Sequence, residues 1–396
     1  MLESREFILG NRTVAECGNL SPETGGGMQK TNFLFCKAQL AALAAAVLPF
    51  FLFPAAATAA QSAHPEEASA QYTGFSMGTF IQGSFYAKDQ KTADALPARF
   101  EKALFAYETL FTVHAAGPMT ELNKKAGEWV VTDCRITDVM DQAKAIARAS
   151  EGAFDPTIGP VVNVWKIGFG GDKVPSDAAI AEAKKHVNWR GIETERREDG
   201  TCRVKIRAGQ NIDLGAIAKG WIGTALTQDL KKAGAVRAIV DLGGNVALLD
   251  SAPSGRAWRV GVQDPKADRG ETLAVIEAKN ESVITSGDYE RYMDAEGKTY
   301  GHILSGKTGR PVPVSFSSVT IVDADGAKAD GWCTALFAMG REKALAYLRE
   351  NPEIRAFLLS PDEKTAWVSE GLAPRLTLLA PDVKLNILTR AASAQK

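Results

Sequence analysis

Asp330 and Thr334 are four residues apart in the segment KADGWCTALF, residues 328–337. If this segment is helical, they lie on one face of the helix, one turn from each other. A carboxylate and a hydroxyl placed in this way offer two hard oxygen ligands to a Mg²⁺ ion, which usually keeps waters and substrate phosphates as its other ligands. The segment therefore indicates a magnesium site. The alternative is an acidic residue that is stabilised near a helix N-terminus by the helix dipole.

A possible anion site lies in DLGAIAKGWIGTAL, residues 213–226, where Asp213 and glycines accompany the start of a predicted helix. The first amides of a helix have no partner within it and suit an anionic ligand. Asp213 can instead be a helix cap, and Lys219 a solvated helix residue. Asp155, before a proline in a glycine-rich loop, and His302, with a side chain that titrates near neutral pH, are further candidates.

The segment YGHILSGKTGRP, residues 300–311, contains the G-x-x-x-x-G-K-T pattern of a nucleotide-binding P-loop. That motif acts at the start of a helix that follows a buried strand. Here the preceding stretch is polar, and Pro311 and Pro313 follow so closely that no helix can begin at Lys307. We therefore predict that the match is accidental and that ATP is not a substrate.

These segments must be positioned by a fold that combines helices and strands. Apolar residues at helical spacing, and helix caps, predict helices over 95–112, 137–149, 216–233, 328–339 and 342–350, and a shorter one after Ser176. Alternating or β-branched runs predict strands over 201–207, 236–241, 256–262, 272–278, 317–322 and 354–360. Because several strands come in adjacent pairs, we expect an α/β or α+β fold with mixed, partly antiparallel sheets flanked by helices.

The composition is that of a globular protein able to bury a core, since 45 % of the 396 residues are hydrophobic and 23 % are charged. The net charge is −1 and there is no basic stripe, so nucleic acid is not an expected partner. The four histidines are scattered along the chain, which argues against a histidine zinc site.

The N-terminal region has the pattern of an export signal. From Met28, two lysines precede an apolar run over 40–53, and Ala57-Thr58-Ala59 then has the form of a cleavage site. We therefore predict an overlong start over 1–27, a signal peptide over 28–59, a linker over 60–70 and one folded domain over 71–390, located in the periplasm. The alternative is an uncleaved membrane anchor.

Three cysteines, Cys134, Cys202 and Cys333, would remain after cleavage. An exported protein meets an oxidising compartment. The number is odd, however, and neither a metal cluster nor a disulfide framework is evident from the spacing. We expect these cysteines to be small buried hydrophobic residues.

Six segments resemble, in order, the motifs of the FAD:protein FMN transferases, the ApbE family, and the resemblance runs from about Gly74 to Leu359. They are GFSMGTF (74–80), GAFDPTIGPVVNVW (152–165), DLGAIAKGW (213–221), VDLGGNV (240–246), VITSGDYERYMDAEGKTYGHILSGKTGRPV (283–312) and KADGWCTALFAMG (328–340). The resemblance implies an ApbE-like, T-fold-like architecture and a flavin transferase domain over 71–390. The resemblance also explains the accidental P-loop match, because the segment that begins at His302 corresponds to the family motif H-I-x-D-P-x-T-G-x-P.

The resemblance also implies a reaction, in which the FMN half of FAD moves onto a threonine hydroxyl of an acceptor redox protein with Mg²⁺, and AMP is released. The protein would associate with a membrane only through its acceptor protein or through an uncleaved signal peptide. The implied metal ligands are Asp330, Thr334 and the backbone carbonyl of Ala216, and the implied FAD-binding residues are Met77, Phe154, Asp155, Asp213, Lys219 and His302. His302 is the candidate base for the threonine proton, and an unperturbed imidazole would make the rate rise with pH near about 6.5.

The chain departs from the family pattern at three places. Ser305 and Gly306 stand where the family has Asp-Pro, Gly331-Trp332-Cys333 fill the normally small or aliphatic positions between Asp330 and Thr334, and 111–122 lack the serine-rich pattern expected before Asn123. Two other activities stay open. Release of AMP without an acceptor would indicate an FAD pyrophosphatase, and tight flavin binding without AMP a non-catalytic flavin-binding maturation factor.

Overall fold

The computed structural model describes residues 8–9, 12–13, 67–268, 270–287 and 291–390. The chain divides into two units, residues 1–61 and 62–396. In the first unit the described residues pair as two short strands, β1 (Ile8–Leu9) and β2 (Arg12–Thr13), within the predicted overlong start. The predicted signal peptide, 28–59, lies outside the described residues. In the part of the chain that is described, no helix is long and apolar enough to cross a membrane.

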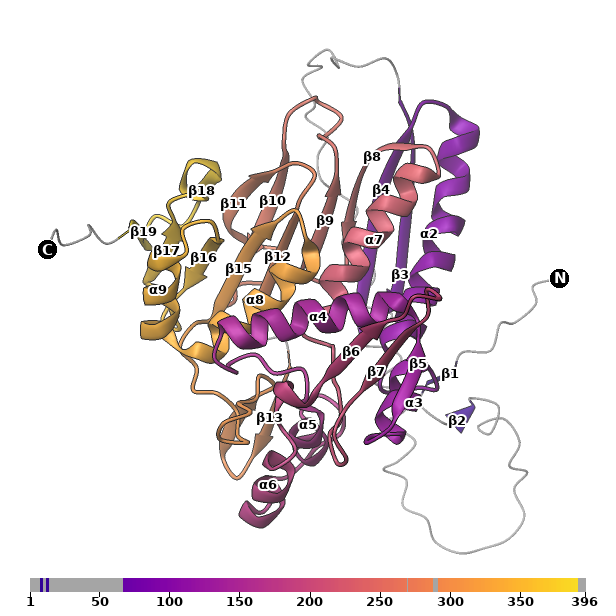
Figure 1. Cartoon of the computed structure of the whole chain (residues 1–396). Coiled ribbons are helices and arrows are strands. Elements are labelled where there is room, and N and C mark those ends of the chain that lie inside the picture. Colours follow the sequence, from indigo (N-terminus) through magenta and orange to yellow (C-terminus); the bar gives the residue numbers. More distant parts are fainter. Residues whose placement is uncertain (1–7, 10–11, 14–66, 269, 288–290, 391–396) are drawn as a thin grey trace, which may run out of the picture. The chain divides into compact units, whose positions relative to one another are not determined.

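The main sheet of the second unit has nine strands within the described residues, in the order β19-β17-β16-β15-β12-β9-β8-β4-β3. All neighbours are antiparallel except β17 and β19. The strands are β3 (Ala68–Ser76), β4 (Thr79–Ala87), β8 (Ala235–Asp241), β9 (Asn245–Leu249), β12 (Ser282–Gly287), β15 (Ser318–Asp323), β16 (Arg355–Leu359), β17 (Thr365–Ser369) and β19 (Lys384–Leu388). β3 and β19 are therefore its edge strands (Figure 1).

Smaller sheets and helices surround the main sheet. The smaller sheets are β10 (Trp258–Gln263), β11 (Thr272–Ala278) and β18 (Leu376–Leu378); β5 (Trp129–Thr132), β7 (Cys202–Lys205) and β6 (Glu193–Arg196); and β13 (Tyr292–Ala295) with β14 (Lys298–Gly301). The helices are α2 (Gln90–Phe111), α3 (Pro118–Lys124), α4 (Cys134–Ala149), α5 (Gly159–Trp165), α6 (Asp177–Lys184), α7 (Ala218–Lys232), α8 (Gly326–Met339) and α9 (Arg341–Glu350), with short 3₁₀ turns at Trp189–Gly191 and Ala373–Arg375.

Two hydrophobic clusters lie on opposite faces of the main sheet. Because side chains alternate along a strand, β15 directs Val319 and Ile321 into the cluster formed with α2, α7 and α8, and Val322 into the cluster formed with β10 and β11. A third, smaller cluster joins α5 and α6 to the β13–β14 hairpin through Trp165 and Met293. The helix layer on one face is visible in Figure 1.

The predicted fold class is confirmed, since mixed and largely antiparallel sheets are flanked by helices. Each predicted helix and strand corresponds to an observed element. Helices α2 and α4 begin earlier than predicted because Asp89 and Asp133 cap them, each accepting a hydrogen bond from an amide of the first turn. The structure also corrects the linker boundary. Glu67 forms a double ion pair with Arg237, and β3 begins at Ala68, so residues 67–70 are folded.

The prediction for the cysteines is wrong for two of the three. Cys134 and Cys202 form a disulfide, whereas Cys333 is a buried residue as expected. The register of β5 and β7 places Thr132 opposite Cys202. Cys134 follows two residues later at the start of α4, within reach of Cys202. The pairing depends on this register between segments 68 residues apart, which the spacing of cysteines alone does not reveal.

Candidate active site

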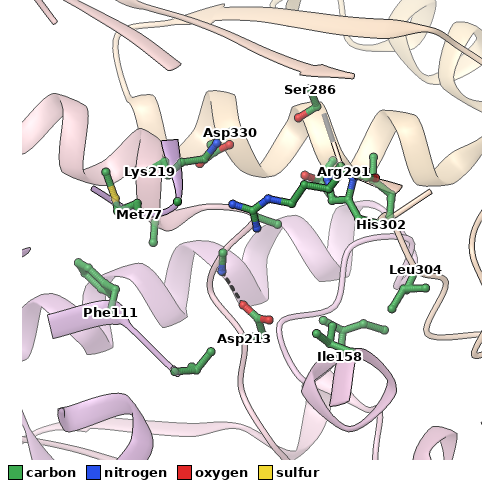
Figure 2. Close-up of a pocket in the computed structure, with 18 of the residues that line it drawn as sticks. Met77, Phe111, Ile158, Asp213, Lys219, Ser286, Arg291, His302, Leu304 and Asp330 are labelled. Carbon is green, nitrogen blue, oxygen red and sulfur yellow. Dashed lines mark hydrogen bonds between the residues drawn. The ribbon is translucent and has the colours of Figure 1, made fainter. Parts of the chain in front are cut away.

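A cavity of about 740 Å³ lies where the start of α7, helix α8, the β3–β4 turn, the loop before α5 and the segment after β14 meet (Figure 2). Its volume is within the range of small-molecule sites, about 300–1,000 Å³. The residues singled out from the sequence all line it: Met77, Phe154, Asp155, Asp213, Ala216, Lys219, His302, Asp330 and Thr334. Segments that are more than 250 residues apart in the chain therefore converge on one space. Their individual roles remain predictions.

Met77 is held at the cavity wall by a tight turn. Met77 and Gly78 are the two residues between β3 and β4, and both have positive φ, 51° and 74°, as a type I′ hairpin turn requires. Glu108 of α2 fixes the turn, since its carboxylate accepts hydrogen bonds from the Met77 amide at 2.9 Å and the Ser76 hydroxyl at 2.6 Å. Glu108, which sequence reasoning missed, therefore positions Met77.

Asp330 reaches the cavity because α7 and α8 cross at two glycines. A Cβ on Gly220 would lie 2.0 Å from the carbonyl oxygen of Gly326, and one on Gly326 would lie 2.2 Å from that of Gly220. No larger residue fits at either position without movement of the backbone. This close approach lets the Asp330 carboxylate accept a hydrogen bond from the Gly220 amide at 2.9 Å.

The environment of Asp330 suits a cation. Its side chain is buried, and burial raises the pKa of the carboxyl, whereas the positive charge of Lys219 and the Gly220 amide act in the opposite direction. The hydroxyl of Thr334, one turn along α8, forms no hydrogen bond with the described residues and also lines the cavity. No group of three or more His, Cys, Asp or Glu side chains in the described chain could hold a metal. The predicted set, however, has one carboxylate, one hydroxyl and one carbonyl, and these hard oxygens fit Mg²⁺ by donor type.

We expected the first amides of α7 to be free to bind an anion, but two of them form hydrogen bonds within the protein. The Ala218 amide donates to the Leu214 carbonyl, and the Gly220 amide donates to Asp330. Asp213 is not the helix cap, because its carboxylate accepts from the Gly215 amide at 2.8 Å within the preceding loop. Lys219 lines the cavity in the first turn and forms no ion pair with the described residues. The side-chain cation, more than the helix amides, is therefore the group available to an anion.

Asp155 contributes mainly to the shape of its loop. One carboxylate oxygen accepts from the amide and the hydroxyl of Thr157, and the other accepts from the Trp189 amide at 3.1 Å. Burial raises the pKa of Asp155, and these hydrogen bonds counteract the effect. The neighbouring Phe154 is buried and lines the cavity. The loop is thus fixed before a ligand enters.

His302 follows β14 and lines the cavity (Figure 2). Its Nδ1 lies 3.1 Å from the carbonyl oxygen of Arg291. Because a carbonyl only accepts, Nδ1 carries the proton of the neutral ring and Nε2 keeps a free lone pair. The pKa of His302 is lowered to about 4, mainly by burial, with the positive charges of Arg291 and Lys219 acting in the same direction. This corrects the expectation of a titration near 6.5, because the imidazole is neutral at physiological pH.

Arg291 is the cavity residue that sequence reasoning missed most clearly. Its guanidinium lies over the ring of Phe169, 5.3 Å from the ring centroid, and Phe169 in turn stacks on His114 at 4.3 Å. It forms no ion pair with the described residues, and Figure 2 shows it reaching into the space between Lys219 and His302. A basic residue inside the SGDYERYM stretch was the available signal. Arg291 and Lys219 give the cavity two cations that can face one anionic ligand.

The segment that matches the P-loop pattern is a closed loop, and no helix begins at Lys307, as predicted. Leu304 pairs with Pro311, and the Ser305 amide donates to the carbonyl of Arg310. The Ser305 hydroxyl accepts a hydrogen bond from the Thr308 amide at 3.2 Å. The turn therefore forms with serine in place of the family aspartate. Trp165 anchors it through a hydrogen bond to the Gly309 carbonyl at 2.8 Å.

The arrangement suits chemistry on a phosphorylated ligand. Two cations face the cavity, a buried acid and a hydroxyl can hold a divalent ion, and a neutral imidazole offers a free nitrogen. Phosphoryl transfer depends on positioning and on neutralisation of charge, and it needs no covalent nucleophile from the enzyme.

Comparison with known proteins points to one family. Residues 77–358 match the ApbE family. An FAD:protein FMN transferase of Klebsiella pneumoniae (strain 342) is 35 % identical over 292 residues, which cover 73 % of this chain and 88 % of that protein. One of Treponema pallidum (strain Nichols) is 33 % identical over 273 residues, 66 % of this chain and 75 % of that protein. The crystal structure of the ApbE protein of Thermotoga maritima superposes with a TM-score of 0.69 at 29 % identity and covers 78 % of this chain and 99 % of that one.

Proposed function

Because the chain belongs to the ApbE family, we propose that it is an FAD:protein FMN transferase, which moves the FMN moiety of FAD onto an acceptor protein. The observation that supports this most strongly is the convergence of motifs from five parts of the chain on a single cavity. That cavity contains two cations without an ion-pair partner among the described residues, Lys219 and Arg291, which suit the pyrophosphate of FAD.

The proposed step exchanges the phosphoanhydride bond of FAD for a phosphoester bond. The acceptor hydroxyl, taken to be that of a threonine, attacks the phosphorus of the FMN half, and a new P–O bond forms. The P–O bond to the AMP half breaks, and AMP leaves with the bonding electron pair. The hydroxyl proton passes to Nε2 of His302, which is unprotonated in the neutral ring.

A Mg²⁺ ion would be held by Asp330, Thr334 and the Ala216 carbonyl. When bound, such an ion neutralises charge that develops on phosphate oxygens. The chain supplies the rest. Arg291 and Lys219 attract and orient the anion, Glu108 keeps the Met77 turn in place, and the Asp155 loop forms part of the cavity wall.

We further propose that the protein acts in the periplasm on a redox protein. The Cys134–Cys202 disulfide supports this location, since disulfides persist in oxidising compartments. The export pattern of residues 28–59 is in agreement with it.

The test uses purified protein that begins at Ala60, with FAD, MgCl₂ and a periplasmic extract of the host cell. We expect a fluorescent protein band in a denaturing gel and release of AMP, and neither without the enzyme. AMP release at the same rate with no acceptor would assign the chain to FAD pyrophosphatases. Tight FAD binding with no AMP would assign it to flavin-binding maturation factors.

A further inference from the structure

The outer edge of β3 is unusual for the edge of a sheet. Natural edge strands are commonly short, charged, interrupted by proline or bulged, which prevents pairing with another chain. β3 has nine residues, ASAQYTGFS, with no charge and no proline, and all nine pair with β4 without a bulge. The opposite edge strand, β19, is shorter and begins with a lysine.

Some backbone amides and carbonyls of β3 are not used in pairing with β4. The two-residue turn makes Ser76 and Thr79 a hydrogen-bonded pair, so the pairs alternate from there along the hairpin. The amides and carbonyls of Phe75, Thr73 and Gln71 therefore point away from β4. In the described residues, only β4 forms hydrogen bonds with the backbone of this strand.

The strand also leads to the cavity. Its last residue, Ser76, is followed by Met77 and Gly78, which line the cavity wall. Beside this turn, Phe75 and Phe80 are 66 % and 58 % exposed and pack edge to face, with ring centroids 5.5 Å apart. An extended segment that paired with β3 would thus be directed at the site of the reaction and would meet an aromatic pair there.

We propose that β3 binds an extended segment of the acceptor protein as an additional strand, with Phe75 and Phe80 packing on its apolar side chains. This inference rests on the proposed function, since transfer to a protein requires a polypeptide at the cavity mouth. Strand addition suits such a partner because main-chain hydrogen bonds provide affinity whatever the exact sequence. The residues at the end of the segment are then delivered to the cavity.

The main test replaces Thr73, whose amide points outward, with proline and with valine. Proline removes the outward amide and leaves the ladder to β4 intact, whereas Thr73→Val keeps the amide and the β-branched shape. The acceptor is the protein found as the fluorescent band above, in purified form. We expect Thr73→Pro to raise the KM for this acceptor about ten-fold or more, and Thr73→Val to leave it nearly unchanged, while both bind FAD as the wild type does.

A second measurement covers the case in which Thr73→Pro does not fold. In the wild-type protein, addition of the acceptor should slow hydrogen exchange at the amides of Gln71, Thr73 and Phe75. Phe75→Ser should also raise the KM for the acceptor, and the matched control Ile387→Ser, 55 % exposed on the opposite edge strand, should not.

The outcomes separate the two proposals. No fluorescent band with the wild type would remove the transferase function itself. Wild-type transfer with full activity in Thr73→Pro, or with no protection of the β3 amides, would overturn the docking site alone. If the wild type self-associates and Thr73→Pro abolishes this association, the edge of β3 binds a second copy of this chain. That result would also overturn the proposal that β3 binds the acceptor.

Discussion

His302 shows how a residue's surroundings decide its chemistry. The Arg291 carbonyl fixes the tautomer that leaves Nε2 free, and burial beside two cations keeps the ring neutral. From the sequence, the residue and its proposed role were accessible. The direction of its pKa shift was not, because the shift depends mainly on burial in the tertiary fold, with Arg291 and Lys219, 11 and 83 residues away along the chain, acting in the same direction.

The first prediction concerns pH. Because the folded pKa of His302 is about 4 and the unfolded value is about 6.5, the unfolded chain binds the extra proton first as pH falls. The native state should therefore lose up to about 3 kcal/mol of stability through this group between pH 6.5 and 4. Urea unfolding at several pH values measures this, and the slope should be smaller in His302→Gln.

The same shift predicts the pH profile of transfer. The wild-type transfer rate should not rise through pH 6.5 because of His302, so the wild type and His302→Gln should have the same pH dependence in this range. His302→Gln should transfer FMN roughly 10²- to 10⁴-fold more slowly and still bind FAD. A rate that rises about three-fold from pH 6 to 7 in the wild type only would show that the ring titrates near 6.5, which would contradict the lowered pKa of His302.

Asp330 provides the second prediction. Asp330→Asn keeps an oxygen for the Gly220 amide and removes the charge, so the fold should persist. If the residue holds Mg²⁺, transfer should fall ~100-fold or more and its dependence on MgCl₂ should weaken. The measurement is initial rate against MgCl₂ concentration. If the dependence of the rate on MgCl₂ is unchanged in the variant, Asp330 does not hold Mg²⁺ and only accepts a hydrogen bond from the start of α7.

At the scale of elements, the site depends on the crossing of α7 and α8. The individual helices were predictable from their periodic apolar residues, as were the β-branched strands of the sheet centre. The Gly220–Gly326 contact was not, since it belongs to the tertiary packing of two segments 106 positions apart. Short elements such as α5, and the β3–β4 hairpin with its glycines and small residues, also escaped prediction because their local pattern is weak.

Gly220→Ala tests the crossing. The added Cβ would lie 2.0 Å from the Gly326 oxygen and 2.7 Å from the Asp330 Cβ, so α7 and α8 must separate. We expect a loss of about 1–3 kcal/mol in stability, the usual effect of overpacking, together with a lower transfer rate as Asp330 moves. Gly301→Ala is the control, because a Cβ there meets nothing within 4 Å. Equal thermal midpoints and rates for the two variants would mean that the crossing is not under steric constraint.

At the scale of the whole molecule, the disulfide joins the start of α4 to β7 across 68 residues. Closing a loop of this length restricts the unfolded chain, and loss of a native disulfide typically costs about 2–5 kcal/mol. Cys134→Ser/Cys202→Ser should therefore unfold at lower urea concentration than the wild type, and dithiothreitol should shift the wild type towards the variant. The control is Cys333→Ala, which should remain sensitive to dithiothreitol. A wild type that is unaffected by dithiothreitol under conditions that reduce the bond would contradict a stabilising role.

In the proposed reaction, the cavity joins FMN to a protein and releases AMP. The most direct measurement is mass spectrometry of the purified acceptor after incubation with enzyme, FAD and MgCl₂, with AMP quantified in the same sample. We predict that the acceptor gains the mass of FMN less one water, on a threonine, with AMP formed in equal amount, and that Asp330→Asn slows the formation of both ~100-fold or more. AMP formed without any change in the mass of the acceptor would contradict the transfer of FMN to a protein.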